Sequence, residues 1–126
     1  MHALKSHASW VRSLNVSRDG QKLISASDDR TVRIWDLVTG DVLAVMSGHA
    51  ASVSAAAFCL DYLHAVSAAE DMTVKLWRLS DGTCLGSVTC ESPMANCLIT
   101  DDGTRAVAID ELLRVHVFSV TLPPLH

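Results

Sequence analysis

The chain has 126 residues, of which 49% are hydrophobic and 19% are charged, and this predicts one domain with a packed core rather than a disordered segment. The formal net charge is -4, so no basic surface for nucleic-acid binding is indicated. No run approaches the roughly 18 apolar residues of a membrane span, and residues 1–10 lack the apolar centre of a secretion signal, so we expect a cytoplasmic protein, with the nucleus as the alternative.

Residues 1–48 predict five short strands. Residues 2–5 have an extended pattern, and apolar or alternating segments between turn residues indicate four more strands at 10–16, 21–26, 31–37 and 42–46. The turns contain Gly20 and Gly40, which can adopt positive φ. The pattern is typical of consecutive β-hairpins.

Residues 49–90 repeat residues 7–48 without an insertion. At this shift, 13 of the 42 aligned positions are identical, whereas chance would give about 2 or 3. The repeat predicts strands at 53–59, 63–67, 73–79 and 83–89. Residues 55–57 are alanines, which suit an innermost strand where neighbouring sheets converge, and a short helix over residues 54–58 is the alternative.

Residues 90–120 form a degenerate third unit, offset from the first by 83 residues. Gly103 matches Gly20, and Phe118 replaces Trp35. The predicted strands lie at 96–100, 105–109 and 115–119. In the tail, residues 121–126, two successive prolines remove backbone donors, so we expect no fourth strand there.

Each complete unit has a histidine at its start and a tryptophan near its end. The first unit carries His7 and Trp35-Asp36, and the second carries Gly48-His49 and Trp77. With the 42-residue period, these features resemble the WD40 repeat family. The resemblance implies an all-β fold, namely a partial WD40 β-propeller of about three four-stranded antiparallel blades. Its repeats would span about 7–48, about 49–89 and, in degenerate form, about 90–120.

Three blades are fewer than the four to eight blades of closed propellers. Two blade faces would therefore stay uncovered, although repeat units of this kind bury their cores against their neighbours. We expect a fragment of a longer chain, an isoform product, or a subunit that must pair. The pairing would be self-association or contact with the missing blades of a parent chain.

The resemblance also implies a buried hydrogen-bonded tetrad of His, Ser, Asp and Trp in each complete unit. The residues at the matching positions are His7, Ser25, Asp29 and Trp35, and then His49, Ser67, Asp71 and Trp77. These types suit such a network, because a carboxylate accepts from an imidazole and a hydroxyl can connect an imidazole to an indole N–H. Ser27 is the alternative to Ser25, which is favoured because Ser67 matches it.

A nucleophilic triad also uses Ser, His and Asp, so a hydrolase is the least favoured hypothesis. The recurrence of the set at the repeat period favours a structural role, and the sequence has no GxSxG motif. It also has no CxxC pair and no HExxH motif, so we expect no metal and no cofactor. We expect reduced, buried thiols at Cys59, Cys84, Cys90 and Cys97, and partly exposed side chains at His2, His64, His116 and His126.

In propellers of this family, partners dock on the face that is built by the loops before the first strand and between the second and third strands. The residues at those positions are Trp10, Arg12, Asp28, Ser52, Ser54 and Glu70. An exposed Trp beside an Arg is typical of a binding hot spot. The alternative is that Trp10 covers the apolar edge of a neighbouring blade.

These observations predict a non-catalytic scaffold that binds other proteins or peptides, without nucleic acid or membrane. The second hypothesis is a regulatory or sensor propeller segment of a larger NACHT-type nucleotide-switch protein. This chain contains no P-loop, so the nucleotide-binding residues of such a protein would lie elsewhere.

Overall fold

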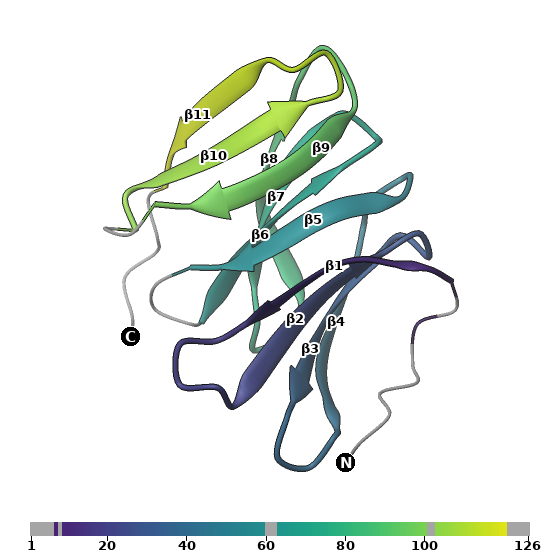
Figure 1. Cartoon of the computed structure of the whole chain (residues 1–126), viewed down its shortest axis with the longest axis vertical. Helices are drawn as coiled ribbons and strands as arrows, with labels where there is room; N and C mark the ends of the chain where they lie inside the picture. The colour runs from purple at the N-terminus through teal and green to yellow at the C-terminus, as the bar shows by residue number, and fades with distance from the viewer. Residues whose placement is uncertain (1–6, 8, 60–62, 101–102, 121–126) are drawn as a thin grey trace.

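The computed structural model describes residues 7, 9–59, 63–100 and 103–120, which form three antiparallel β-sheets (Figure 1). Sheet I contains β1 (Val11–Val16), β2 (Lys22–Ser27), β3 (Thr31–Asp36) and β4 (Val42–Ser47). Sheet II contains β5 (Val53–Phe58), β6 (His64–Ala69), β7 (Thr73–Arg78) and β8 (Thr83–Thr89). Sheet III contains β9 (Met94–Ile99), β10 (Arg105–Asp110) and β11 (Val115–Ser119).

Within each sheet the strands lie side by side in chain order, as consecutive hairpins require. The predicted all-β architecture of a partial propeller is confirmed. None of the described residues belongs to a helix that is long and apolar enough to cross a membrane. Two predicted segments, the strand at 2–5 and the tail at 121–126, lie outside the described residues, as do His2 and His126.

The turn between the second and third strands has the same backbone conformation in every sheet. Arg30, Met72 and Leu113 have φ values of 73°, 71° and 66°. Left-handed backbone is uncommon for residues other than glycine. Because these three residues lie at matching repeat positions, the third unit keeps the turn geometry of the first two although its sequence has diverged.

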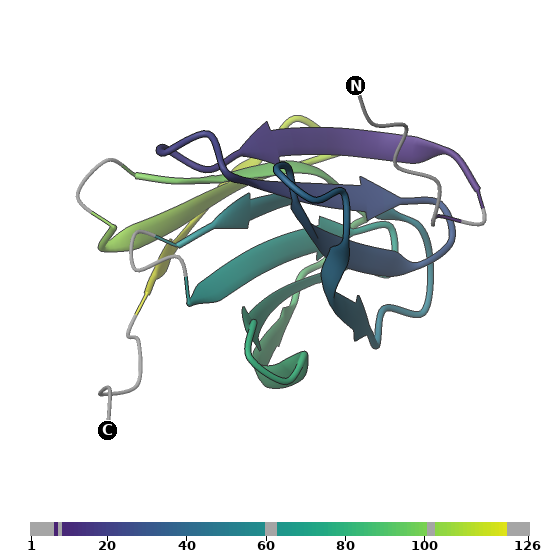
Figure 2. The same cartoon turned by 90° about the horizontal axis from the view of Figure 1, so that it is seen from below.

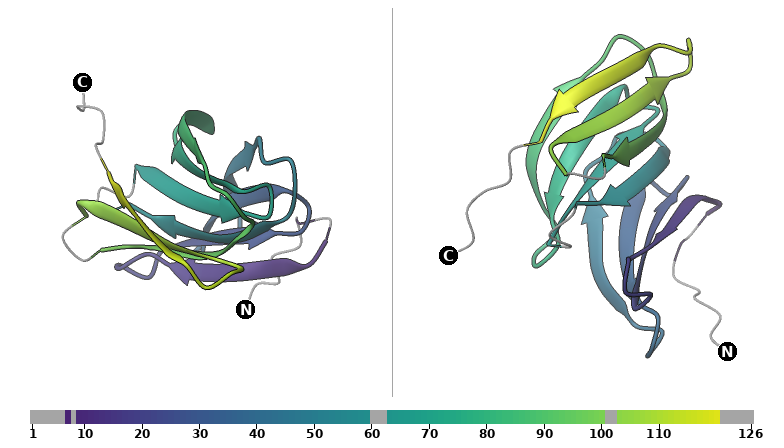
Figure 3. Two further views of the ribbon diagram at one scale, coloured as in Figure 1. Left: turned by 90° about the horizontal axis from the view of Figure 1, so that it is seen from above. Right: turned by 60° about the vertical axis from the view of Figure 1, so that its left-hand side comes forward.

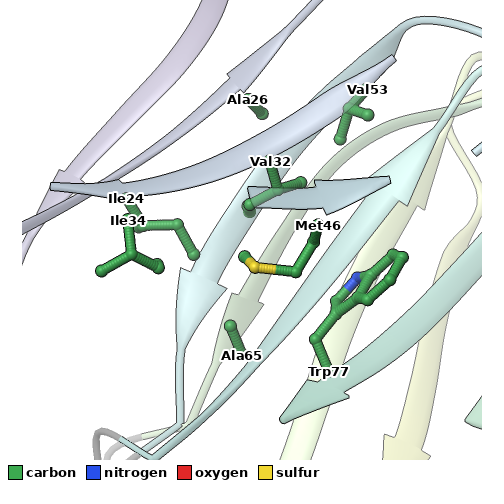
Figure 4. Close-up of a cluster of buried hydrophobic side chains, with 9 residues drawn as sticks. Ile24, Ala26, Val32, Ile34, Met46, Val53, Ala65 and Trp77 are labelled. Carbon is green, nitrogen blue, oxygen red and sulfur yellow. The ribbon is translucent and has the colours of Figure 1, made fainter. Parts of the chain in front are cut away.

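Two hydrophobic clusters hold the three sheets together. The first joins Ile24, Val32 and Met46 of sheet I to Val53 and Trp77 of sheet II, and Figure 4 shows Met46 and Trp77 side by side in this layer. The second cluster joins the opposite face of sheet II to sheet III. It contains Ala55, Cys59, Val66, Ala68 and Val74 of sheet II and Met94, Cys97 and Ala108 of sheet III.

Sheet II is therefore covered on both faces, and all six residues of β6 are buried. The right-hand view of Figure 3 shows sheet II between the other two sheets. The inner strands β1, β5 and β9 lie along one side of the molecule, and β4 and β8 lie on the opposite side (Figure 2). The sheets converge at the inner strands and diverge at the outer ones, as blades of a propeller do.

The convergence explains the three alanines at 55–57. They lie in β5, and Ala55 and Ala56 are buried where β5 packs beside β1 and β9. The alternative of a short helix over residues 54–58 is wrong. Small side chains are needed because the inner strands of neighbouring sheets approach closely.

Two expectations about side-chain exposure, for His64 and for Cys84, are wrong. His64 is buried at the start of β6, rather than partly exposed, because both faces of sheet II are covered. Cys84 is exposed on the outer strand β8, rather than buried, because none of the three described sheets packs over that edge. Cys59 and Cys97 are buried between sheets II and III, as expected.

Candidate functional site

The four residues that sequence comparison grouped in the first repeat form one chain of hydrogen bonds. The Nδ1 atom of His7 lies 2.8 Å from Asp29 Oδ2, and its Nε2 atom lies 2.6 Å from Ser25 Oγ. The indole N–H of Trp35 donates to the same Ser25 oxygen at 2.8 Å. Ser27, the alternative to Ser25, instead donates to the carbonyl of Trp10 at 2.8 Å.

The second repeat has the same geometry within about 0.1 Å. His49 Nδ1 lies 2.9 Å from Asp71 Oδ2, and its Nε2 lies 2.6 Å from Ser67 Oγ. Trp77 donates to Ser67 Oγ at 2.7 Å. Because Trp77 occupies one acceptor position of the Ser67 oxygen, the Ser67 hydroxyl proton is free to point at Nε2, and the Nδ1 proton then points at Asp71.

The ionisation of the second tetrad agrees with this proton assignment. Burial lowers the pKa of His49 below 6.5, although Asp71 acts in the opposite direction. Burial acts to raise the pKa of Asp71, but hydrogen bonds from the Thr73 hydroxyl, the Ala50 amide and His49 outweigh it and lower that pKa to about 2. At neutral pH the pair is therefore a neutral imidazole and an ionised carboxylate.

Sequence reasoning missed a fifth member of each network, a threonine two residues after the aspartate. Thr31 donates its hydroxyl to Asp29 Oδ1 at 2.6 Å, and Thr73 donates to Asp71 Oδ1 at 2.5 Å. The signal was present, because these threonines are identical at the 42-residue shift. In each network the threonine hydroxyl donates to one carboxylate oxygen, Oδ1, and the histidine contacts the other, Oδ2.

Sheet III has a different polar network at the same end of the sheet. Asp110 is fully buried and accepts from Arg114 Nε and from His116 Nε2, both at 2.9 Å. Burial acts to raise the pKa of Asp110, but hydrogen bonds from His116 and Arg114 outweigh it and hold that pKa well below its usual range. Arg114 also donates to Ser92 at 3.2 Å. Sequence comparison could not find this network, because Asp110, Arg114 and His116 have no counterparts of the same type in the other repeats.

Among the residues predicted to bind partners, Trp10 is exposed, and Arg12 forms ion pairs with Asp28 and Glu70. Trp10, directly before β1, is 78% exposed. Beside it, Arg12 Nε contacts Asp28 Oδ1 at 2.5 Å, and its Nη2 contacts Glu70 Oε1 at 3.2 Å. The arginine therefore connects the turn of sheet I to the turn of sheet II.

The two serines make contacts within the protein, Ser54 through its side chain and Ser52 through its backbone. Ser54 donates to the carbonyl of Met94 at 2.7 Å and so joins β5 to β9. The carbonyl of Ser52 accepts from the Glu70 amide at 2.9 Å. Ser54 thus connects sheets II and III beside the predicted binding face.

An acidic residue stands at the same place in all three sheets. The amides of Asp28, Glu70 and Glu111 donate to the residues that precede or begin the first strand of their sheets, at 2.8, 2.9 and 2.9 Å. Sequence reasoning selected Asp28 and Glu70 but missed Glu111, although the shift of 83 residues places it opposite Asp28. The three carboxylates share one end of the molecule with Trp10.

A groove of about 570 Å³ follows the inner strands toward the other end of the sheets. Leu14 and Val16 of β1, Phe58 of β5 and Leu98 of β9 contribute to its walls. In the part of the chain that the structure describes, no three His, Cys, Asp or Glu side chains are grouped as metal ligands. The lining of the groove also includes the amide side chains of Asn15 and Asn96.

Comparison with known proteins supplies a family and several relatives. A family model described as "WD domain, G-beta repeat" matches residues 1–36 and 40–78, which is more than half of the chain. The chain is 53% identical over 45 residues to the nuclear distribution protein PAC1 of Eremothecium gossypii, a match that covers 36% of this chain and 9% of that protein.

Two further relatives have different names. The chain is 46% identical over 50 residues to the probable E3 ubiquitin ligase complex SCF subunit sconB of Arthroderma benhamiae, covering 40% of this chain and 8% of that protein. It is 40% identical over 58 residues to the DENN domain and WD repeat-containing protein SCD1 of Arabidopsis thaliana, covering 46% of this chain and 5% of that protein. The matched segments span less than a tenth of the length of each relative.

Proposed function

Because the chain belongs to the WD40 repeat family, we propose that it is a non-catalytic scaffold that binds other proteins or peptides through the end of the sheets that carries Trp10. The exposed indole of Trp10 beside the Arg12 ion pairs is the observation that carries this proposal. One relative is by name a subunit of a ubiquitin ligase complex, which supports a role in assembly.

The arrangement of the tetrads supports a structural rather than a catalytic role for their serines. Ser25 and Ser67 are buried, and each hydroxyl oxygen already contacts an indole N–H and an imidazole nitrogen. A catalytic serine must reach a substrate carbonyl. Ser25 and Ser67 are at most 1% exposed, so neither oxygen is accessible to a substrate while the tetrad is intact.

The charge around Trp10 favours a partner with a basic segment. Arg12 is shared between Asp28 and Glu70, so this cluster keeps a net negative charge, and Glu111 adds another at the matching position of sheet III. An indole face attracts a Lys or Arg side chain through its quadrupole. A peptide that places a cation over Trp10 and near these carboxylates fits both features.

Selection of displayed peptides against the immobilised chain tests this proposal. We expect the enriched peptides to contain Lys or Arg, and we expect Trp10→Ala to raise their dissociation constant by about 30-fold, the loss of about 2 kcal/mol that marks a hot spot. Val38→Ala is the matched control, because Val38 is 69% exposed but lies in the turn between β3 and β4. Equal affinity of wild type and Trp10→Ala would contradict the proposed face.

A second variant separates binding from folding at this face. Both ion pairs of Arg12 are partly exposed, and such pairs contribute about 0–1 kcal/mol to stability. We therefore expect Arg12→Ala to keep its circular dichroism spectrum and nearly the same melting temperature while peptide affinity changes. Unfolding of Arg12→Ala would make this residue structural and the assignment of the face wrong.

No observation favours the second hypothesis, a regulatory segment of a NACHT-type nucleotide-switch protein. None of the three relatives named above carries that description. That hypothesis stays a prediction.

A further inference from the structure

Each sheet of this molecule has two faces, which are directed toward different neighbouring sheets. We call the face toward the next sheet in the chain the leading face, and the face toward the preceding sheet the trailing face. The first hydrophobic cluster joins the leading face of sheet I to the trailing face of sheet II, and the second cluster joins the leading face of sheet II to the trailing face of sheet III. The leading face of sheet III and the trailing face of sheet I have no such neighbour among the described residues.

The leading face of sheet III has the composition of the two leading faces that are covered. In sheet I this face contains Ile24, Ala26, Val32 and Ile34, all buried, and at the 42-residue shift sheet II has Val66, Ala68, Val74 and Leu76. At the 83-residue shift the matching residues of sheet III are Val107, Ile109, Val115 and Val117. All four are β-branched and apolar, yet Val115 and Val117 are 64% and 58% exposed.

The trailing face of sheet I shows the complementary exposure. Val53 and Ala56 of β5 are buried against sheet I, and Met94 and Cys97 of β9 are buried against sheet II. Their counterparts in β1 are Val11 and Leu14, which are 47% and 59% exposed. Among the described residues, one leading face and one trailing face are therefore uncovered.

We propose that a second copy of this chain covers both faces, with the leading face of sheet III in each copy packed on the trailing face of sheet I in the other. The proposal goes beyond the peptide-binding function, because it concerns the faces of sheets I and III rather than the end of the sheets that carries Trp10. A second copy fits because it carries both faces in the right pairing, and the contact continues the leading-to-trailing packing that the chain already uses twice. Two copies supply six blades, and closed propellers of four to eight blades are stable.

The geometry of such a contact predicts a closed pair. Each contact joins two different surfaces, a leading face and a trailing face, and with two copies the second contact is the reverse of the first, so the interface as a whole is isologous. Two copies related by a two-fold axis make two equal contacts and leave no apolar face uncovered. The resulting species has a defined mass rather than growing with concentration.

Light scattering on the purified 126-residue chain over a hundredfold range of concentration tests the proposal. We expect a mass of twice 13.5 kDa. We expect Val117→Asp and Leu14→Asp each to raise the dissociation constant of the pair by about tenfold or more, since each places an unpaired charge in both contacts. Val38→Asp is the control, because it places the same charge on an exposed valine outside both faces, and it should keep the doubled mass.

Mixing the two variants tests the head-to-tail arrangement. A mixed pair of Val117→Asp and Leu14→Asp has one contact that carries both substitutions and one contact that is entirely native. We therefore expect native mass spectrometry to show mixed pairs in excess over either variant paired with itself. If a variant alone is unfolded by circular dichroism, recovery of the folded spectrum on mixing is the expected result.

Four outcomes would overturn the proposal. A single-chain mass for the wild type at every concentration would mean that a second copy does not cover these faces. A mass that keeps growing would mean open association. Loss of pairing in Val117→Asp but not in Leu14→Asp would mean that sheet III packs on itself, and failure of the mixture to form mixed pairs would exclude the head-to-tail contact.

Discussion

At the residue scale, the tetrads show how one hydroxyl connects two aromatic side chains that hydrophobic packing alone would not orient. In sheet II, Ser67 accepts from Trp77 and contacts His49, so removing it leaves an indole N–H and an imidazole nitrogen without a partner. Sheet III is a natural comparison. Ala108 stands at the position of Ser67, and Phe118, which has no N–H, stands at that of Trp77, so the donor and the acceptor are absent together.

This arrangement predicts a clear difference between two serine variants. We expect Ser67→Ala to lower the free energy of unfolding by about 1–3 kcal/mol, the cost of leaving buried polar groups unpaired. Ser87→Ala is the control, because Ser87 is exposed on β8 and contacts only Lys75 Nζ among its recorded hydrogen bonds, at 3.3 Å. Urea unfolding measures both, and an equal change in the two variants would contradict a stabilising role for the tetrad.

At the scale of elements, the turns decide how closely neighbouring sheets approach. Gly20 and Gly82 both have positive φ, 75° and 71°. A Cβ atom at Gly20 would meet nothing within 4 Å, whereas one at Gly82 would lie 2.9 Å from the carbonyl oxygen of Val45 in sheet I. Gly82 is therefore needed for both its backbone conformation and the contact between sheets I and II.

The two glycines predict different costs for the same substitution. We expect Gly20→Ala to lower the free energy of unfolding by about 1 kcal/mol, the penalty of left-handed backbone for a residue with a Cβ. Gly82→Ala should lower it further, because the new Cβ atom meets a backbone atom that cannot rotate away. Thermal unfolding of the two variants makes the comparison, and the same loss in both would mean that the sheets separate there without cost.

At the scale of the whole molecule, the position of a sheet in the row determines how well it is buried. Sheet II lies between two sheets, so every residue of β6 is buried, whereas three of the five residues of β11 are exposed. A strand with both faces covered opens only when the neighbouring sheets separate. Sheet III can open at its free edge without disturbing the first hydrophobic cluster.

Hydrogen exchange should report this order. We expect the amides of β6 to exchange at least about tenfold more slowly than those of β11, because local opening is easiest where few apolar contacts are lost. Mass spectrometry of peptides from the two strands provides the measurement. Similar exchange in β6 and β11 would indicate that the three sheets unfold as one unit.

For the part of the chain that the structure describes, the amino-acid sequence alone determined the strands, their order and the membership of the tetrads. These features follow from short-range rules, since apolar alternation selects strands, turn residues end them, and a period of 42 residues identifies equivalent positions such as His7 and His49. The strand at 53–58 was ambiguous only because its three alanines favour a helix over a strand when they are taken by themselves.

Only the tertiary structure decided which surfaces meet. The contact of Arg12 with Glu70, the burial of His64 and the exposure of Cys84 depend on which sheet faces pack together. The network around Asp110 depends on three side chains that the repeat does not predict. Periodicity specifies which side chains lie on each face of a strand. Contacts between sheets, however, join residues far apart in the chain, and their geometry arises only when the apolar faces are buried together.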